Sequence, residues 1–305
     1  MSEHNPRAKS RAADIHVISP AGVVLDAERL HRARANLAAR GYRVALDRGV
    51  LARDRRFAGS DRSRLAAFRR AARSAARIVM ISRGGYGITR LLAELDFAEL
   101  AASGKHWVGF SDFTAFQLAM LAREKAPTWS GPSLIEDYGG KPDPTTADVF
   151  DDAMAGRLQV LGFASRGPSG IDESGILWGG NLAMVCSLLA TPYMPAVRGG
   201  ILMLEDVGEH PYRIERMLSQ LLQAGVIDAQ AALLLGSFNG FRPAVHDGGY
   251  GLADVIRWLR RQTKTPVIEG LPFGHGVAKL TLPHGSEVGL ASSRGQTYLV
   301  MPHAH

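Results

Sequence analysis

The stretch "HWVGFSDFTAFQLAM", His106 to Met120, contains the change of secondary structure that decides the fold. The apolar run "HWVGF" is typical of a buried strand, and the residues after Ser111 and Asp112 have the pattern of a helix. A serine at such a turn can be a nucleophile, because its Oγ is exposed beside a backbone N–H that receives an oxyanion. The stretch alone favours a helix cap formed by Ser111 or Asp112, since Phe113 replaces the last glycine of the G-x-S-x-G motif.

The residues around this stretch alternate in the same way between strand-like and helix-like segments. The predicted strands are "DIHVIS", "RVAL" and "ARIVMIS", and the predicted helices are "DAERLHRARANLAARGY", "RSRLAAFRRAA" and "ITRLLAEL". This alternation predicts an α/β fold with a parallel, Rossmann-like sheet covered on both faces. Ligands of such sheets bind at the loops that leave the carboxyl ends of the strands, where "SRGGYG" and "GFSD" fall.

The second half of the chain predicts a smaller, β-rich domain. We place the N-terminal domain at residues 1–160, a turn-rich linker at 161–175 and the C-terminal domain at 176–305. In the last of these, "ILMLE" and "ALLLGSF" are predicted strands, separated by the amphipathic helix "PYRIERMLSQLLQAG". The tail alternates apolar and polar residues between turn signals, which predicts antiparallel strands.

Composition excludes several classes of protein. The 305 residues are 46% hydrophobic and 21% charged, with no apolar run long enough for a membrane helix and no secretory signal, so we expect a cytoplasmic protein without a membrane partner. The single cysteine, Cys186, excludes an internal disulfide and a cysteine metal cluster, and H-E-x-x-H is absent, so no metal or cofactor is expected.

The net charge of the chain is +7, and arginines gather between Arg53 and Arg77. They alternate with alanines and lack aromatic partners, which favours a solvated helix face over a nucleic-acid site.

A serine nucleophile needs a base and a carboxylate that orients the base. Of ten histidines, His275 in "GLPFGHGVAKLTLP" is the most accessible, because small residues flank it, although spacing alone does not select it. The candidate carboxylates lie in "ILMLEDVGEHPYRIERML" and can equally be surface charges or caps: Glu205, Asp206, Glu209 and Glu215. Glu205 directly follows an apolar strand. In "SRGGYG", Gly84 and Gly85 can present amides to an anion and Arg83 can bind a carboxylate, or the loop can be a tight turn.

Seven stretches, in this order along the chain, together resemble the LD-carboxypeptidase family of serine peptidases. They are "SRGGYG", "GFSDFTAFQLAM", "SGPSL", "LWGGNLAMVCSLLATPYMP", "LEDVGEHPYRIERMLSQL", "LLLGSFNG" and "GLPFGHGVAKLTLPHG". The resemblance implies a Ser-Glu-His triad of Ser111, Glu205 and His275, an active site between two domains, and a homodimer. It also implies a substrate, a murein tetrapeptide that loses its terminal D-alanine. Family members often have His-Gly-Pro where this chain has Ser130-Gly131-Pro132, which bears on local substrate contacts.

Within this interpretation, the amides of Asp112 and of Gly84 or Gly85 stabilise the oxyanion. Arg83 is the first candidate for the substrate carboxylate and Arg213 the second. A first alternative is an immunity-type hydrolase that cleaves an aminoacyl-nucleotide, for which Trp178 could stack on the base, although "LWGGNL" is equally consistent with core packing. A second alternative is a non-catalytic α/β module that binds a sugar or a nucleotide, and retention of all three triad residues argues against it.

Overall fold

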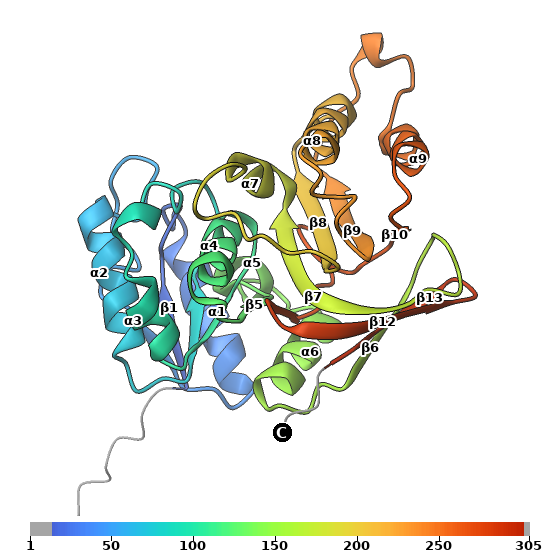
Figure 1. The fold of residues 1–305 in the computed structure, drawn as a ribbon. Coiled ribbons are helices and arrows are strands. Elements are labelled where there is room, and N and C mark those ends of the chain that lie inside the picture. Colours follow the sequence, from blue (N-terminus) through green and yellow to red (C-terminus); the bar gives the residue numbers. More distant parts are fainter. Residues whose placement is uncertain (1–13, 302–305) are drawn as a thin grey trace, which may run out of the picture.

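A computed structural model describes residues 14–301, which form two sheets that lie side by side (Figure 1). The first sheet has the strand order β11-β5-β4-β3-β1-β2. Its strands are β1 (Ile15–Ile18), β2 (Val44–Leu46), β3 (Ile78–Ile81), β4 (His106–Gly109), β5 (Thr128–Ser130) and β11 (Leu282–His284). The strands from the N-terminal half are all parallel, and only β11 pairs antiparallel, with β5. The predicted parallel sheet is confirmed.

Helices cover both faces of this sheet. They are α1 (Ala27–Ala39), α2 (Asp61–Ala72), α3 (Phe97–Ala102), α4 (Thr114–Glu124), α5 (Leu134–Tyr138) and α6 (Pro144–Met154). The helices α1, α5 and α6 pack on one face of the sheet, and α2, α3 and α4 pack on the other. Asp26, Ser60, Asp96 and Asp143 each accept a backbone N–H of the first turn of the helix that follows, which explains where four of these helices begin.

The second sheet is mixed and has the strand order β10-β9-β8-β7-β12-β13-β6. Its strands are β6 (Val160–Ala164), β7 (Asp172–Asn181), β8 (Ile201–Val207), β9 (Ala232–Asn239), β10 (Val267–Glu269), β12 (Glu287–Ser293) and β13 (Gln296–Val300). The long strand β7 pairs antiparallel with β12 over its first half and parallel with β8 over its second half. The antiparallel tail is therefore confirmed for β12 and β13, while β8, β9 and β10 are parallel.

The two halves of the molecule share one hydrophobic core. The helices α7 (Leu182–Ser187), α8 (Pro211–Gln223) and α9 (Leu252–Gln262) cover the second sheet. Phe116 of α4, Leu182 of α7 and Leu202 of β8 belong to the same buried cluster. Gly180 lies so close to α4 that a Cβ atom there would stand 2.9 Å from Cγ2 of Thr114. The end of β7 therefore packs directly on the helix that follows Ser111.

One predicted helix of the N-terminal half differs from the structure. The segment "ITRLLAEL" is not one helix, because it forms turns and the short 3-10 helix η1 (Leu92–Glu94). Its first residue, Ile88, donates its backbone N–H to the Asp112 carboxylate at 2.9 Å, and Asp96 caps a new helix, α3. These two side-chain contacts outweigh the helical composition of the segment.

The predicted linker at residues 161–175 contributes strands to the second sheet. Val160–Ala164 forms β6 at the edge of this sheet, and β7 begins at Asp172. Turn residues between these two strands produce the linker-like composition of the segment. The domain boundaries themselves stay a prediction.

Candidate active site

Ser111 lies at a strained turn between β4 and α4. The strand ends at Gly109, and Ser111 opens the 3-10 helix η2 (Ser111–Phe113) with a φ of 62°. Left-handed φ values are costly for residues other than glycine, and such strain is concentrated at functional sites. A side chain at Gly109 would come within 2.7 Å of the Phe113 ring, so glycine allows the chain to turn this sharply. The turn therefore has the backbone strain of a nucleophile elbow.

Asp112 anchors this turn to the loop that leaves β3. Its buried carboxylate accepts the backbone N–H of Ile88, and α4 has no side-chain cap. Burial raises the pKa of Asp112 to about 6, although the backbone N–H groups of Ile88 and Gly87 lower it. The Asp112 carboxylate thus binds the backbone of the adjacent loop and does not cap the helix.

The glycine loop after β3 lies against Ser111. A Cβ atom at Gly84 would stand 2.8 Å from both Cβ and Oγ of Ser111, so a side chain is excluded there. The carbonyl of Gly84 accepts the N–H of Gly22 at 3.3 Å. Because a trans peptide directs its C=O and N–H to opposite sides, the N–H of Gly85 points away from Gly22. The structure brings together the predicted serine and the predicted glycine loop.

Glu205 is a buried carboxylate near the carboxyl end of β8. Its side chain has no exposed surface, and Asn181, its neighbour on β7, donates Nδ2–H to Oε1 at 3.2 Å. The pairing of β8 with β9 is irregular at this residue, opposite Gly236, and β-bulges of this kind redirect side chains. A Cβ atom at Gly274 would stand 2.6 Å from Cβ of Glu205, so the loop that carries His275 can approach only with glycine there.

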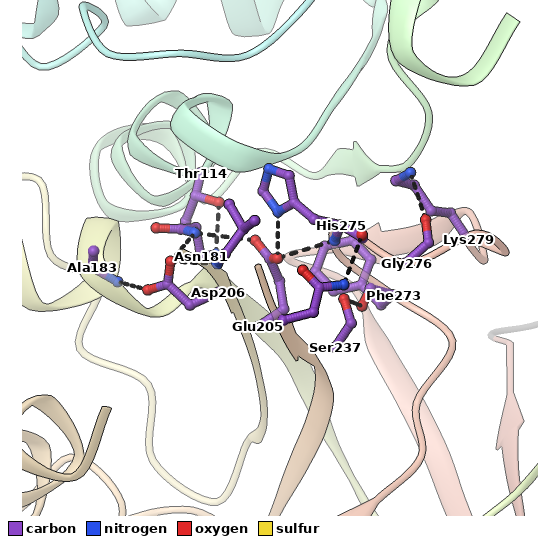
Figure 2. A network of polar contacts seen from close by, with 12 residues as sticks. Thr114, Asn181, Ala183, Glu205, Asp206, Ser237, Phe273, His275, Gly276 and Lys279 are labelled. Atoms are coloured by element: carbon purple, nitrogen blue, oxygen red, sulfur yellow. Dashed lines mark hydrogen bonds and ion pairs between the residues drawn. The ribbon is translucent and has the colours of Figure 1, made fainter. Parts of the chain in front are cut away.

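His275 binds Glu205 through one ring nitrogen (Figure 2). Nδ1 lies 2.8 Å from Oε2 of Glu205, and the backbone N–H of His275 donates to the same oxygen at 3.3 Å. Burial lowers the pKa of His275, but the hydrogen bond and charge of Glu205, with a smaller contribution from Glu136, raise it above its ordinary value overall. The ring also packs on Phe110, the residue before Ser111, with 4.9 Å between ring centroids. The carboxylate and histidine predicted from the sequence are a hydrogen-bonded pair next to the serine turn.

Three residues of this site were not assigned from the sequence. Asn181 lies in the quoted stretch "LWGGNL", and its position at the end of a strand was the available signal. Lys279 donates to Asp137 at 2.6 Å and to the carbonyl of Gly276, and its ammonium lies 4.7 Å from the Phe110 ring centroid. Asp137 and Lys279 are both buried, although they lie 142 positions apart, and this separation hides their contact from sequence analysis.

A further chain of contacts connects the two halves of the site. Thr114 accepts the N–H of Asn181 at 3.0 Å, so the helix after the serine contacts the residue that binds Glu205. Beside His275, a cavity of about 380 Å³ opens between the α5–α6 region and the histidine loop. Its lining includes Glu136, Lys141, Gly276 and Val277. The lining thus carries side chains of both charges and includes the residue that follows His275.

The proposed substrate-binding residues have different surroundings. Arg83 is half-buried, donates to the carbonyl of Val23 at 3.0 Å and lies 4.0 Å from the carboxylate of Glu136. Arg213 is exposed at the start of α8, where its guanidinium contacts Tyr212 and Glu209. Arg83 is therefore next to the catalytic candidates, whereas the contacts of Arg213 are at the surface.

Trp178 was a candidate stacking surface with core packing as the equal alternative, and the structure contradicts the stacking role. Its side chain is 1% exposed, and its indole N–H donates to Gln230 at 3.0 Å. An aromatic ring in the shared core cannot receive a substrate base. Ser130, the last residue of β5, is also buried, and its hydroxyl contacts the side chain of Gln117 in α4.

Groups that could bind a metal or react as a thiol are few in the described part of the chain. Residues 14–301 contain no cluster of three His, Cys, Asp or Glu side chains placed around a common metal position. Burial raises the pKa of the Cys186 thiol to about 12, so it stays protonated at neutral pH.

Within residues 14–301, no helix combines the length and the apolar character that a membrane crossing requires.

A buried carboxylate that orients a histidine, beside a serine on a strained strand-to-helix turn, is the arrangement of a serine hydrolase. Comparison with known families defines the class more narrowly. Residues 15–131 match the LD-carboxypeptidase N-terminal domain, and residues 174–290 match the LD-carboxypeptidase C-terminal domain. The chain belongs to the LD-carboxypeptidase family of serine peptidases.

Three relatives illustrate the range of this family. The crystal structure of muramoyltetrapeptide carboxypeptidase from Oxalobacter formigenes has 42% identity and a TM-score of 0.88, over 95% of this chain and 99% of that one. The murein tetrapeptide carboxypeptidase of Pseudomonas aeruginosa is 34% identical over 70% of this chain and 71% of its own length. A structure of the microcin C7 self-immunity protein MccF has 21% identity and a TM-score of 0.86, over 95% of this chain and 96% of that one, and this likeness shows the fold alone.

Proposed function

We propose that this protein removes the terminal D-alanine from murein tetrapeptides, with Ser111 as nucleophile, His275 as general base and Glu205 as the orienting carboxylate. The observation that carries the proposal is the 2.8 Å contact between His275 Nδ1 and the buried Glu205 carboxylate, on a ring that packs against the residue before Ser111. The names of the Pseudomonas and Oxalobacter relatives support the substrate class.

The first step is proton transfer from Ser111 to His275. Glu205 accepts the Nδ1–H of His275, which leaves the lone pair on Nε2 free to accept the Ser111 proton. Oγ then attacks the carbonyl carbon of the last peptide bond. As that C–N bond breaks, Nε2 returns the proton to the departing D-alanine nitrogen. Water hydrolyses the resulting ester with the same histidine as base, which regenerates Ser111.

Backbone amides would stabilise the negative oxygen that forms in each step. The amide of Asp112 is in the serine turn, and the amide of Gly85 is in the loop that lies against Ser111. Of the two glycines considered, Gly85 is favoured because its N–H points away from Gly22. One such donor contributes roughly 3–4 kcal/mol to the transition state.

An exopeptidase must also recognise the free carboxylate at the end of its substrate. Arg83 is half-buried beside the glycine loop, and its guanidinium can bind a carboxylate through two parallel N–H groups. We assign this role to Arg83, with Arg213 as the second candidate. Glu136, 4.0 Å from Arg83, neutralises part of its charge and helps to hold its position when no substrate is bound.

Hydrolysis of an aminoacyl-nucleotide is the alternative within the same fold. It would use the same three residues and would require a surface on which the base can stack. Trp178 was the candidate for that surface and is buried in the core. The murein peptide is therefore the better-supported substrate.

The experiment that tests the proposal is mass spectrometry of a muropeptide tetrapeptide incubated with the protein. Wild type should release one D-alanine, and Ser111→Ala should release none. If neither acts, the proposed substrate is wrong and an aminoacyl-nucleotide is tested next. If both act, Ser111 is not the nucleophile. The cytoplasmic location, the homodimer and the domain boundaries remain predictions, and sedimentation velocity would test the dimer.

A further inference from the structure

A second cavity lies at the opposite end of β4 from Ser111. Its volume is about 540 Å³, within the range of roughly 300–1,000 Å³ that is usual for small-molecule sites. Both sheets contribute to its lining. Arg77 directly precedes β3, His106 is the first residue of β4 and Trp129 lies in β5, whereas Val160 and Val300 come from β6 and β13. Nothing in the proposed reaction uses this cavity.

The polar side of this cavity has more hydrogen-bond donors than acceptors. The guanidinium of Arg77 donates to His106 Nε2 at 2.9 Å, and the indole N–H of Trp129 donates to His106 Nδ1 at 3.1 Å. A neutral imidazole accepts a hydrogen bond at only one of its nitrogens, since the other carries a proton. One of the two donors therefore lacks a true acceptor, whichever tautomer His106 adopts.

Protonation of His106 would remove its remaining acceptor nitrogen and leave both donors without an acceptor. Burial and the charge of Arg77 both lower the pKa of His106, which favours the neutral ring. The twelve residues that line the cavity include no aspartate or glutamate. The donors of Arg77, His106 and Trp129 thus share one cavity wall with no carboxylate to balance the guanidinium.

The rest of the lining is mostly apolar. The remaining apolar side chains are those of Ala153, Leu158, Val160, Pro283, Val300 and Met301. Val160 is 54% exposed and Val300 is 41% exposed, and the two valines are paired between β6 and β13. A ligand with an apolar body would cover both of them while its acceptor atoms meet the donors of Arg77 and Trp129.

We propose that this cavity binds a small organic acid with an apolar body, whose carboxylate accepts hydrogen bonds from Arg77 and from the donor that His106 leaves unsatisfied. The apolar body packs on the Trp129 ring, Leu158 and the two exposed valines. Because the lining comes from both sheets, the bound acid stabilises their packing. The site is independent of the proposed carboxypeptidase reaction.

Calorimetric titration of the full chain tests the site without any turnover. The probes are octanoate and 4-phenylbutyrate, each paired with its neutral amide. Wild type should bind at least one acid saturably, and the matching amide should bind on the order of tenfold more weakly or worse, since it lacks the charge that strengthens these hydrogen bonds. The melting temperature should rise with the concentration of the acid.

Three variants connect the binding to this cavity. Arg77→Gln should weaken the acid roughly tenfold or more, with little effect on the amide. Val160→Trp should fill the cavity and abolish the binding of both. Arg73→Gln is the matched control, because Arg73 is an exposed arginine that pairs with Glu99 and does not line the cavity. Failure of both acids to bind wild type, or unchanged binding to Arg77→Gln, would overturn the proposal.

Discussion

The two sides of the candidate active site are constructed in different ways. The serine side consists of backbone held in position by small residues, with Ser111 at a φ of 62° and Gly84 against its side chain. The Glu–His side consists of buried polar side chains, in which Asn181 and His275 both bind Glu205. An added atom should therefore be most damaging on the serine side, and a lost charge on the Glu–His side.

The largest effect expected is that of Glu205→Gln, which removes the charge and leaves the shape nearly unchanged. An amide at this position can stabilise the wrong tautomer of His275 and cannot support its protonated form, so kcat should fall on the order of 10⁴-fold. Glu205 raises the pKa of His275, and the base works only when neutral. Residual activity should therefore extend to lower pH in the variant, which a pH profile of kcat/KM would show.

The matched comparison for this prediction is Asp206→Asn, at the next position along β8. Asp206 is also buried, and it binds the N–H groups of Asn181, Ala183 and Val207 instead of a histidine. Its replacement should leave the acid limb of the pH profile in place. An equal loss of kcat in the two variants would mean that Glu205 matters for folding rather than for orienting His275.

The next prediction concerns Lys279, which contacts Phe110 beside the serine turn and Gly276 beside His275. Lys279→Met leaves Asp137 buried without its cation, and breaking such a pair typically costs about 3–5 kcal/mol of stability. Lys279 also lowers the pKa of His275, so its removal should move the acid limb of kcat/KM to higher pH, opposite to Glu205→Gln. Urea unfolding and the pH profile measure the two effects separately.

The exposed Lys264 provides the control, since Lys264→Met removes a charge outside the core. The double variant Lys279→Met/Asp137→Leu should regain part of the lost stability, because no unpaired charge stays buried. It should still show the shifted pH profile, since the ammonium is absent. An unshifted profile in both Lys279 variants would limit this residue to a structural role.

Local patterns were sufficient to predict most of the first sheet, whereas they only nominated the triad residues among other candidates. The strands around Ser111 are short and apolar and alternate with capped helices, so each segment carries its own signal. Glu205 and His275 were selected by their positions at strand ends and by the family resemblance. Their hydrogen bond is a contact between residues 70 positions apart, which a pattern along the chain does not encode.

The residues that sequence analysis missed or misplaced depend on tertiary contacts. The sequence of "LWGGNL" is equally consistent with a stacking surface and with core packing for Trp178, and its ring fills the core that the two sheets share. Strand β11 was expected in the second domain and instead pairs with β5 in the first sheet. In both cases the contacts include residues from the other half of the chain, which a local pattern does not reveal.

On the serine side, Gly84→Ala adds a single carbon atom. That atom would stand 2.8 Å from Cβ and Oγ of Ser111, so either the serine or the glycine loop must move. Loss of nucleophile alignment together with one oxyanion donor should lower kcat roughly 10²- to 10³-fold. Gly140→Ala is the control, since a Cβ atom there has no neighbour within 4 Å. Steady-state kinetics of the two variants would show whether crowding, rather than the loss of any glycine, lowers kcat.

The smallest effect expected is that of Arg83→Ala, which should raise KM with little change in kcat. A charged hydrogen bond to the substrate carboxylate contributes about 1.5–3 kcal/mol, so KM should rise roughly 10- to 100-fold. Glu136 then faces the incoming carboxylate without its neighbouring cation, which adds repulsion that salt should weaken. Arg213→Ala removes an exposed arginine paired with Glu209 and should change KM only slightly. Equal changes in KM would exclude Arg83 from carboxylate recognition, and a fall in kcat alone would place Arg83 with the groups that position Ser111.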